Sequence, residues 1–441
     1  MKKWFVLMAI CLAFAQVGSA QIKMNGFVRP YTAVNLHAPN NYMIMEEKAS
    51  ITTTLSGSDA RGVFVLDTWY HHLTQTANWD LTEAYVDLFF ENADLRIGKQ
   101  QVVWGKADGI PINDIVCPWN LQDFILQDFD DIRIGLNMVK ANYYFSFVNL
   151  EALWIPKFHP MELAQSGPWV FSLPDTLNLP LETPGGLDNL PVSISYHQPV
   201  LPADKLGNSE FGFRLYGFNL GFDWALSYLD AWDDVPALSE KQLYASLTPA
   251  GMVPDSIGIW QAYNRMKMVG FNFSRPVLTG VLRAEGGYFT GKQFGLDGIN
   301  LDSTGATIGP FSVTKPYAQY MVGWDQNWKS WLNLSGQFIE QRILDYDPAI
   351  QNDEINRLVS LLVRGGFMNE TLQYQILALG NLDYEDALMR TMLTYNYSDG
   401  VRLILGADFL IAGKNSTTFR QFDFGRFDQN DNAYLKVIYS F

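Results

Sequence analysis

Single charged residues recur inside stretches of this chain that otherwise alternate between apolar and polar side chains. Arg402 and Asp408 interrupt the alternating stretch 401–411, and Arg390 interrupts 389–396 in the same way. Because successive side chains of a β-strand point to opposite faces, each stretch would have one apolar face and one face that carries charge. Charges of both signs on one face can orient and filter a charged solute.

The composition predicts where such two-faced strands are used. Of the 441 residues, 14% are aromatic and only 17% are charged, against roughly 25% charged in typical soluble domains. No long apolar run follows residue 20, so no membrane-spanning helix is predicted. A chain that crosses a bilayer without helices must pair its backbone polar groups internally, as a closed barrel does. The sequence therefore predicts an all-β transmembrane barrel with an apolar outside and a wet, charged inside.

Short and long connections alternate along the chain between these stretches. Eight tight turns and nine longer connections predict an antiparallel up-and-down barrel of about 18 strands, with 16 as the alternative. The short turns of such barrels face the periplasm and the long loops face outward. The tight turns are expected at 57–60, 91–94, 140–142, 219–221, 276–280, 326–327, 369–370 and 398–400, and the long connections at 36–42, 73–79, 105–131, 157–208, 233–262, 291–315, 342–357, 381–385 and 413–431.

The two ends of the alternating region are suited to pair with each other. The stretch 433–441 has Leu435, Val437, Tyr439 and Phe441 on one parity, and 22–36 alternates in the same manner. Pairing them would close the sheet and remove its edges. A C-terminal strand that ends in Phe resembles the assembly signal of Gram-negative outer-membrane barrels. That resemblance implies the barrel-assembly machinery as a partner of this strand.

Residues 1–20 are predicted to be a cleaved export signal. Lys2 and Lys3 precede an apolar run, and Gly18 to Ala20 offer the small residues that signal peptidase accepts. Residues 21–441 would then form a single barrel domain in the outer membrane of a Gram-negative-type cell. The net charge of −15 argues against nucleic acid as a partner and leaves membrane lipid and a small solute. Cys117, alone outside the signal, is expected to be a shielded thiol.

The residues expected to line the inside share the parity opposite to the aromatic-rich face. An arginine at the bilayer midplane would cost about 2 to 4 kcal/mol facing lipid and little facing water. The alternative is that these charges merely neutralise one another and brace the wall. The residues predicted to line a pore are Arg29, Glu83, Asp87, Arg96, Lys99, Gln100, Arg133, Arg214, Asp223, Arg283, Glu285, Arg364, Arg390, Arg402 and Asp408.

The hairpin within 81–105 is the most distinctive segment. Strict alternation would point Lys99 at lipid, so a bulge at Gly98 is expected to turn it inward. The motif RIGKQ (96–100) followed by WG (104–105) resembles a hairpin of porin-like Gram-negative barrels. These include a largely uncharacterised porin-like group and, more distantly, the alginate-export barrels. The motif match is confined to this hairpin and the loop beyond it, and elsewhere the resemblance is architectural. It implies a channel and leaves the substrate open.

The connection after this hairpin is acidic and interleaved with large apolar residues. It can fold back into the mouth of the barrel with its acids facing the arginines, whereas a solvated outer loop is the alternative. The connection 157–208 is too long and proline-rich for a plain link and is expected to form a lid or plug. The residues predicted to form a constriction are Trp104, Asp108, Asp114, Trp119, Asp123, Asp128, Asp130 and Asp131.

A channel for small hydrophilic solutes, for uptake or export, is the favoured function. An outer-membrane hydrolase would need a nucleophile and a base, yet the chain has five histidines and no G-x-S-x-G elbow. No enzyme activity, cofactor or metal is therefore expected, and His71 and His72 would point opposite ways along a strand. An adhesin, receptor or structural barrel with a plugged lumen is the alternative. A hydrophobic solute is disfavoured by the inner arginines, and a homo-oligomer is compatible with the sequence.

Overall fold

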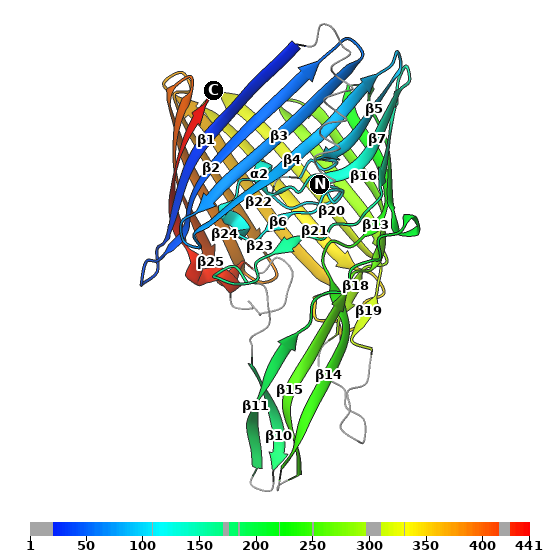
Figure 1. Cartoon of the computed structure of the whole chain (residues 1–441), viewed down its shortest axis with the longest axis vertical. Coiled ribbons are helices and arrows are strands. Elements are labelled where there is room, and N and C mark those ends of the chain that lie inside the picture. The colour runs from blue at the N-terminus through cyan, green and yellow to red at the C-terminus, as the bar shows by residue number, and fades with distance from the viewer. Residues whose placement is uncertain are drawn as a thin grey trace.

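The chain forms one antiparallel sheet of 18 strands that closes into a barrel (Figure 1). The computed structural model describes residues 21–107, 109–170, 176–183, 186–219, 221–248, 251–296, 310–329, 331–413 and 424–441. The predicted export signal lies outside them. The barrel strands are β1 (Gln21–Asn35), β2 (Tyr42–Ser56), β3 (Ala60–His71), β4 (Thr76–Phe89), β5 (Ala93–Gln100), β7 (Leu136–Tyr144), β8 (Asn149–Ile155), β12 (Glu210–Asn219), β13 (Phe222–Trp232), β16 (Arg265–Val277), β17 (Gly280–Thr290), β20 (Tyr317–Lys329), β21 (Leu332–Ile343), β22 (Ile355–Phe367), β23 (Leu372–Asn381), β24 (Asp386–Ser398), β25 (Val401–Ile411) and β26 (Asn432–Ser440).

Short elements occupy the connections. In the described part of the chain, no helix is long and apolar enough to cross a membrane. The short elements are β6 (Asn120–Leu121), η1 (Phe124–Leu126), α2 (Phe129–Ile132), β9 (Glu162–Leu163), η2 (Leu206–Asn208), β18 (Gln293–Gly295), β19 (Ser312–Thr314) and η3 (Gly425–Asn430).

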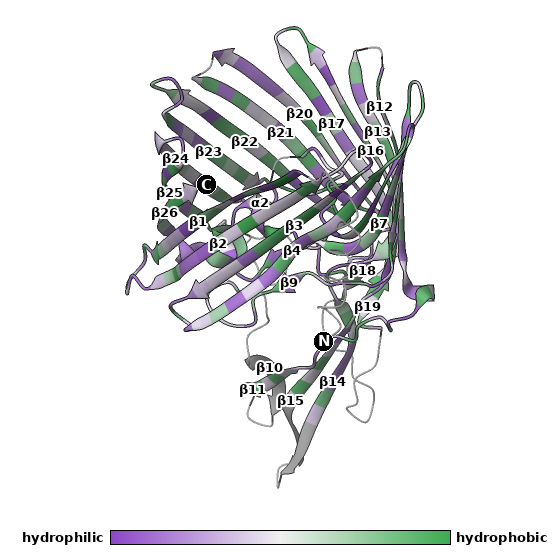
Figure 2. Cartoon of the chain, turned by 45° about the horizontal axis from the view of Figure 1, so that its top comes forward, coloured by the Kyte–Doolittle hydropathy of each residue, from purple (hydrophilic) through white to green (hydrophobic). Residues whose placement is uncertain are grey.

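Alternation along the strands separates an apolar outer face from a polar inner face, as the changing colours along the strands of Figure 2 illustrate. On β25, Leu405 is 57% exposed on the outside, whereas Asp408 on the opposite parity is fully buried. On β26, Leu435 is exposed and Lys436 is buried. The predicted 18-stranded barrel with two unlike faces is confirmed.

The first and last strands close the barrel. β1 pairs antiparallel with β26, from Phe27 opposite Ser440 to Asn35 opposite Asn432. Just before this ladder, Gly26 and Phe441 exchange two backbone hydrogen bonds of 2.9 Å. The Phe441 ring fills the space beside Gly26, where an added Cβ would lie 2.9 Å from the ring. The predicted pairing of the two ends is confirmed.

The turn predicted at 140–142 is wrong. These residues lie inside β7, and the chain turns between Tyr144 and Asn149. Lys140 and Asn142 have polar side chains because they face the lumen, where Asn142 Nδ2 donates to Asp94 at 2.7 Å. Polarity on the inner face thus imitated a turn signal.

Two further boundaries differ from the prediction. The turn expected at 326–327 comes later, because β20 continues to Lys329 and β21 begins at Leu332. The loop expected at 73–79 is shorter, because β4 already begins at Thr76. The other predicted turns fall between consecutive barrel strands.

A second sheet of four strands projects from the loop end of the barrel (Figure 1). Its order is β10 (Thr176–Thr183), β11 (Gly186–Tyr196), β15 (Gly251–Ala262) and β14 (Ala237–Thr248). In its described part, Val192, Ile257 and Ile259 form a small apolar cluster. The strands come from two connections that the sequence predicted as loops. The lid or plug predicted for 157–208 is therefore wrong for the hairpin 176–196, which points away from the lumen.

Candidate functional site

Most charges predicted for the pore lie on the inner face. The strand ladders set them in rows: Arg390 lies opposite Asp408 and donates to it at 3.0 Å, and Arg96 lies opposite Asp87 and donates to it at 2.6 Å. Arg133 is an exception, because it belongs to the loop before β7. The inner-face residues are Arg29, Glu83, Asp87, Arg96, Gln100, Arg214, Asp223, Arg283, Glu285, Arg364, Arg390, Arg402 and Asp408.

The prediction of a bulge at Gly98 that turns Lys99 inward is wrong. The ladder runs through Gly98 and Lys99 without a shift, with Lys99 opposite Ala84. The register shift lies one strand away in β4, between Leu81 and Glu83. Gly98, at φ 133°, instead allows close approach of β4, because an added Cβ would lie 2.2 Å from the Ala84 carbonyl oxygen. The Lys99 ammonium does meet an acid, Asp80, at 2.8 Å.

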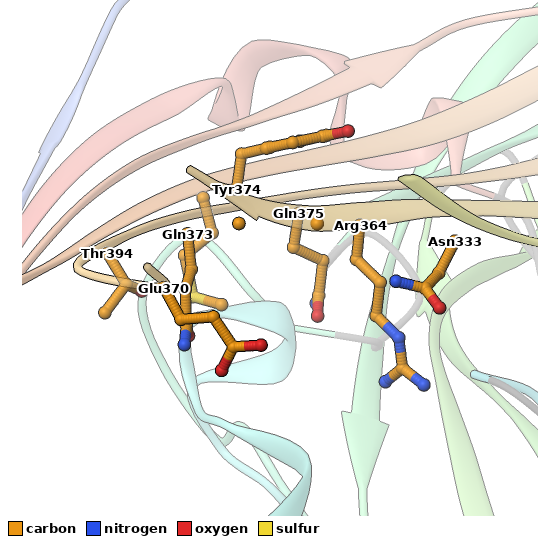
Figure 3. A pocket seen from close by; sticks show the side chains of 10 residues that line it. Asn333, Arg364, Glu370, Gln373, Tyr374, Gln375 and Thr394 are labelled. Carbon is orange, nitrogen blue, oxygen red and sulfur yellow. The ribbon is translucent and has the colours of Figure 1, made fainter. Parts of the chain in front are cut away.

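Of the inner arginines without an ion pair in the described chain, Arg214 lies directly opposite Glu151 in its ladder, whereas the other two, Arg364 and Arg402, lie opposite uncharged residues. Within the described ranges, no acidic side chain lies within ion-pair distance of either. Arg364 lines a pocket of about 280 Å³ near the turn end, together with Asn333, Gln375 and Glu370 (Figure 3). These side chains offer a guanidinium, amides and a carboxylate to anything in the lumen.

The connection between β5 and β7 runs inside the barrel (Figure 1). We call residues 101–135 the inserted loop. Its Ile112 and Leu126 belong to one apolar cluster with inner residues of β1, β2 and β20 to β26. Its Trp104 and Cys117 belong to a second apolar cluster with inner residues of β7, β8, β13, β16 and β17. The inserted loop therefore bridges two sides of the wall and narrows the lumen.

Glu285 on β17 anchors the first half of the inserted loop. Its side chain is fully buried and accepts the backbone N–H groups of Lys106 and Asn113 at 2.6 and 2.7 Å. Asn113 Nδ2 donates in turn to the Asn272 side chain at 2.7 Å. A buried carboxylate needs such donors, and the loop backbone supplies them.

Acids anchor the second half of the inserted loop to the seam. Asp131 accepts from Arg29 Nη1 at 2.6 Å and from Lys48 Nζ at 3.2 Å. Asp128 accepts from Lys436 Nζ at 2.8 Å. The predicted acids and the wall cations are thus brought together at β26, β1 and β2. We call Arg29, Lys48 and Lys436 the seam row.

The other predicted constriction residues act within the loop or against β8. Trp104 Nε1 donates to Glu151 at 2.6 Å, and Asp114 pairs with Arg133. Asp123 accepts from Gln127 at 3.1 Å. Burial raises the pKa of Asp114, although Arg133 opposes the shift. Burial also raises the pKa of Asp123.

The remaining members of that set are placed as follows. Trp119 forms an isolated β-bridge with Arg133. Asp108 lies outside the described residues, as does the side chain of Asp130.

Three connections meet over the inserted loop through aromatic rings. Phe124 lies 5.5 Å from Trp169 and 5.2 Å from Phe427, measured between ring centroids. Asn430 Nδ2 donates to the Pro168 carbonyl at 2.7 Å. The segment 156–170 and η3 therefore cover part of the inserted loop from the loop end of the barrel.

The docking of the inserted loop is expected to depend on pH. Burial alone would raise the pKa of Asp131, but Arg29 and Lys48 outweigh it and hold the pKa below its ordinary value. A carboxyl with a lower pKa when docked stabilises docking above its ordinary pKa of about 4, and that contribution is lost as the pH falls through the docked value. We therefore expect the contribution of Asp131 to docking to be constant from pH 7 to about 5, and the ion conductance of the barrel to rise as that contribution is lost below about pH 4.

Planar-bilayer recordings across this range test the expectation. The variant Asp131→Asn lacks the titrating group and should show a high conductance with no step near pH 4. A wild-type step that persists unchanged in Asp131→Asn would contradict the assignment to this carboxyl.

The sequence prediction missed two members of the seam row, Lys48 and Lys436. Both lie on the inner parity of their strands, so the parity rule that selected Arg29 would have selected them too. Their role depends on acids far away in sequence, because Lys436 and Asp128 are 308 residues apart. Only the folded barrel brings them together.

The adjacent histidines His71 and His72 contact different acids. His71 contacts Glu46 on the inner parity, whereas His72 contacts Glu47 on the outer one, as alternation predicts. In the described residues, no group of three or more His, Cys, Asp or Glu is arranged to hold a metal. Cys117 is buried, and burial raises the pKa of its thiol to about 12.

Three solved structures have a similar fold, and one of them, OpdK, is described as an outer-membrane protein. OpdK from Pseudomonas aeruginosa aligns with a TM-score of 0.51 at 9% identity, over 96% of this chain and 98% of that one. OccAB1 from Acinetobacter baumannii aligns with a TM-score of 0.51 at 9% identity, over 96% of both chains. OccK2 (OpdF) from Pseudomonas aeruginosa, solved with glucuronate, aligns with a TM-score of 0.50 at 11% identity, over 95% of this chain and 98% of that one.

At these identities the similarity concerns the fold. No curated protein matches the sequence. Residues 36–418 match the family described as "Protein of unknown function (DUF1302)". This match spans most of the barrel, and the chain belongs to the DUF1302 family.

Proposed function

We propose that this protein is an outer-membrane channel that passes small hydrophilic, charged solutes past the inserted loop. The observation that carries the proposal is the inner wall, where charges of both signs line a closed barrel and a loop is anchored across it. A barrel with 16 to 18 strands is wide enough for a water-filled lumen. The fully buried Glu285 and the seam row hold the loop in that lumen rather than over it.

The solute class follows from the free groups on the wall. Arg364 and Arg402 have no acidic partner among the described residues and would attract small anions, with amides beside Arg364 for hydroxyl groups. OccK2, whose fold is similar, was solved with glucuronate, a small carboxylate. This supports anionic solutes such as carboxylates as the first class to test. No enzymatic step is part of the proposal.

Location and orientation are part of the same proposal. Residues 1–20 would direct export, and β26 would guide insertion by the barrel-assembly machinery. The short turns would face the periplasm and the four-stranded sheet the exterior. The barrel would act alone or as a homo-oligomer.

Reconstitution in planar bilayers tests the channel. We expect stepwise ion-permeable openings, and under a salt gradient a reversal potential that changes when Arg364 and Arg402 are both replaced by Gln. A folded protein that shows no openings, even after the inserted loop is released by Glu285→Ala, would refute the proposal. It would favour the second candidate, a receptor or adhesin that acts through the four-stranded sheet.

The projecting sheet favours that second candidate. It is a structured unit of four strands that contributes nothing to barrel closure. Deleting the hairpin 176–196 should leave conductance intact if the barrel is a channel, and should abolish surface binding if the sheet is a receptor.

A charged substitution tests which face of the strands contacts lipid. Leu405 lies midway along β25 on the outer face, so Leu405→Arg should destabilise the barrel in lipid by about 2 to 4 kcal/mol. The matched variant Gln373→Arg places the same side chain on the inner face, opposite the uncharged Gly366 and Thr394, and should change stability little. Denaturant unfolding in lipid vesicles measures both. Equal effects of the two variants would contradict the assignment of faces.

A further inference from the structure

The seam row places three cations side by side on neighbouring strands. Arg29 lies directly opposite Lys48 in the β1–β2 ladder, and Lys436 lies opposite Tyr31 in the β1–β26 ladder. Like charges directly opposite each other destabilise a sheet. The row therefore requires nearby anions.

The wall supplies only part of the counter-charge. Asp67 contacts Lys48 at 2.9 Å, and Glu46 approaches Arg29 at 3.7 Å. Lys436 differs: its side chain is 2% exposed, and among the described residues its one ion-pair partner is Asp128 of the inserted loop. A buried ammonium without a counter-ion is costly. The anion that satisfies Lys436 thus belongs to the inserted loop and not to the wall.

The two loop acids occupy the seam row as neighbours. Arg29 Nη1 reaches Asp131 at 2.6 Å and Asp128 at 3.5 Å, so one nitrogen contacts both carboxylates. Lys48 also donates to Asp131, and Lys436 also donates to Asp128. Tyr31 and Tyr434 flank the Lys436 ammonium at 4.5 and 5.2 Å from their ring centroids. The two loop carboxylates contact the seam row as the two ends of a bound dicarboxylate would, although both belong to the inserted loop.

We propose that the seam row is a binding site for small dicarboxylates, and that Asp128 and Asp131 occupy it as intramolecular ligands until such a solute displaces them. Displacement exchanges one pair of carboxylates for another, so the cations remain neutralised. The inserted loop loses its anchors at this side of the wall and is freed to move. This inference rests on the proposed channel, because the solute must reach the lumen.

The chemistry of the site defines the ligand. A flexible dicarboxylate can contact Arg29, Lys48 and Lys436 together, whereas a monocarboxylate can replace only one loop acid. A diamine is repelled by the row. Binding should therefore follow the order dicarboxylate, monocarboxylate, diamine.

The test uses the full-length protein in detergent with a nitroxide at the exposed loop position Gln122→Cys. Cys117 is buried and stays unlabelled. Glutarate, butyrate and 1,5-diaminopentane are titrated while the mobility of the nitroxide is recorded. We expect glutarate to mobilise the loop saturably, butyrate to require at least tenfold more, and the diamine to have no effect.

Removing the two carboxylates of the inserted loop that occupy the seam row gives a second test. In Asp128→Asn/Asp131→Asn, the loop should be mobile without glutarate, and calorimetry should show glutarate binding at least tenfold tighter because no competitor remains. In Lys436→Gln, binding should weaken at least tenfold. The matched variant Asp204→Asn removes an acid from an exposed pair with Lys157 and should behave as wild type. Heat-modifiable migration on gels confirms that each barrel is folded.

Two results would overturn the proposal. One is unchanged glutarate affinity in the folded double variant. The other is a loop that stays immobile at saturating glutarate. The channel itself is judged separately by bilayer conductance: loop release without ion flow refutes the channel alone, and ion flow without loop release refutes the dicarboxylate site alone.

Discussion

Replacing Glu285 by alanine is expected to release the inserted loop and to raise single-channel conductance severalfold. Glu285 is fully buried and accepts the backbone N–H groups of Lys106 and Asn113. A hydrogen bond to a charged group contributes about 1.5 to 3 kcal/mol, so losing two costs about 3 kcal/mol or more. A difference of that size shifts the ratio of docked to undocked loop by roughly a hundredfold.

Two controls separate release of the loop from damage to the barrel. Glu285→Gln keeps the shape but turns one acceptor into a donor, so its conductance should lie between wild type and Glu285→Ala. Glu340→Ala removes an acid from the outer face near the loop end and should not change conductance. If folded Glu285→Ala conducts like wild type, the inserted loop is not the element that narrows the lumen.

Replacing Gly26 by valine is expected to lower the yield and stability of the closed barrel. A Cβ at Gly26 would lie 2.4 Å from the Ser50 carbonyl oxygen and 2.9 Å from the Phe441 ring. The clash would push Phe441 off the position where its backbone bonds to residue 26. Overpacking of this kind costs about 1 to 3 kcal/mol, and here it acts on the contact that closes the sheet.

The matched control is Gly336→Val on β21, because an added Cβ there meets nothing within 4 Å. The melting temperature of the folded form, read from heat-modifiable migration, should fall by several degrees for Gly26→Val and remain near wild type for Gly336→Val. A similar fall for both would show that the loss of glycine in a strand, not the seam, is responsible.

Residues that face lipid and residues that face the lumen could be told apart from sequence, because that pattern is local. Leu405 and Asp408 fall on opposite parities of one strand, and the pleat alone sends them to opposite faces. The same rule misled where the inner face is unusually polar. Lys140 and Asn142 resembled a turn, although they pair with residues of neighbouring strands.

The register of the strands and the positions of bulges could be predicted less well from the sequence. The bulge was expected at Gly98, the residue best suited to an unusual backbone, but the shift lies in β4 beside Thr82. A register shift depends on how two strands fit together, so neither strand alone reveals it. For the same reason two long connections were predicted as loops, although they pair with each other in a separate four-stranded sheet.

The sequence by itself determined the barrel, its approximate strand number, its two faces and the pairing of its ends, because alternation and turn residues act over a few positions. The tertiary structure alone decided that Asp128 and Asp131 contact the seam row and that Glu285 accepts hydrogen bonds from the backbone of the inserted loop. It also decided that, in the described chain, Arg364 and Arg402 have no acid within ion-pair distance. Those contacts join residues many strands apart. Their energies come from burial and charge pairing that exist only once the sheet has closed.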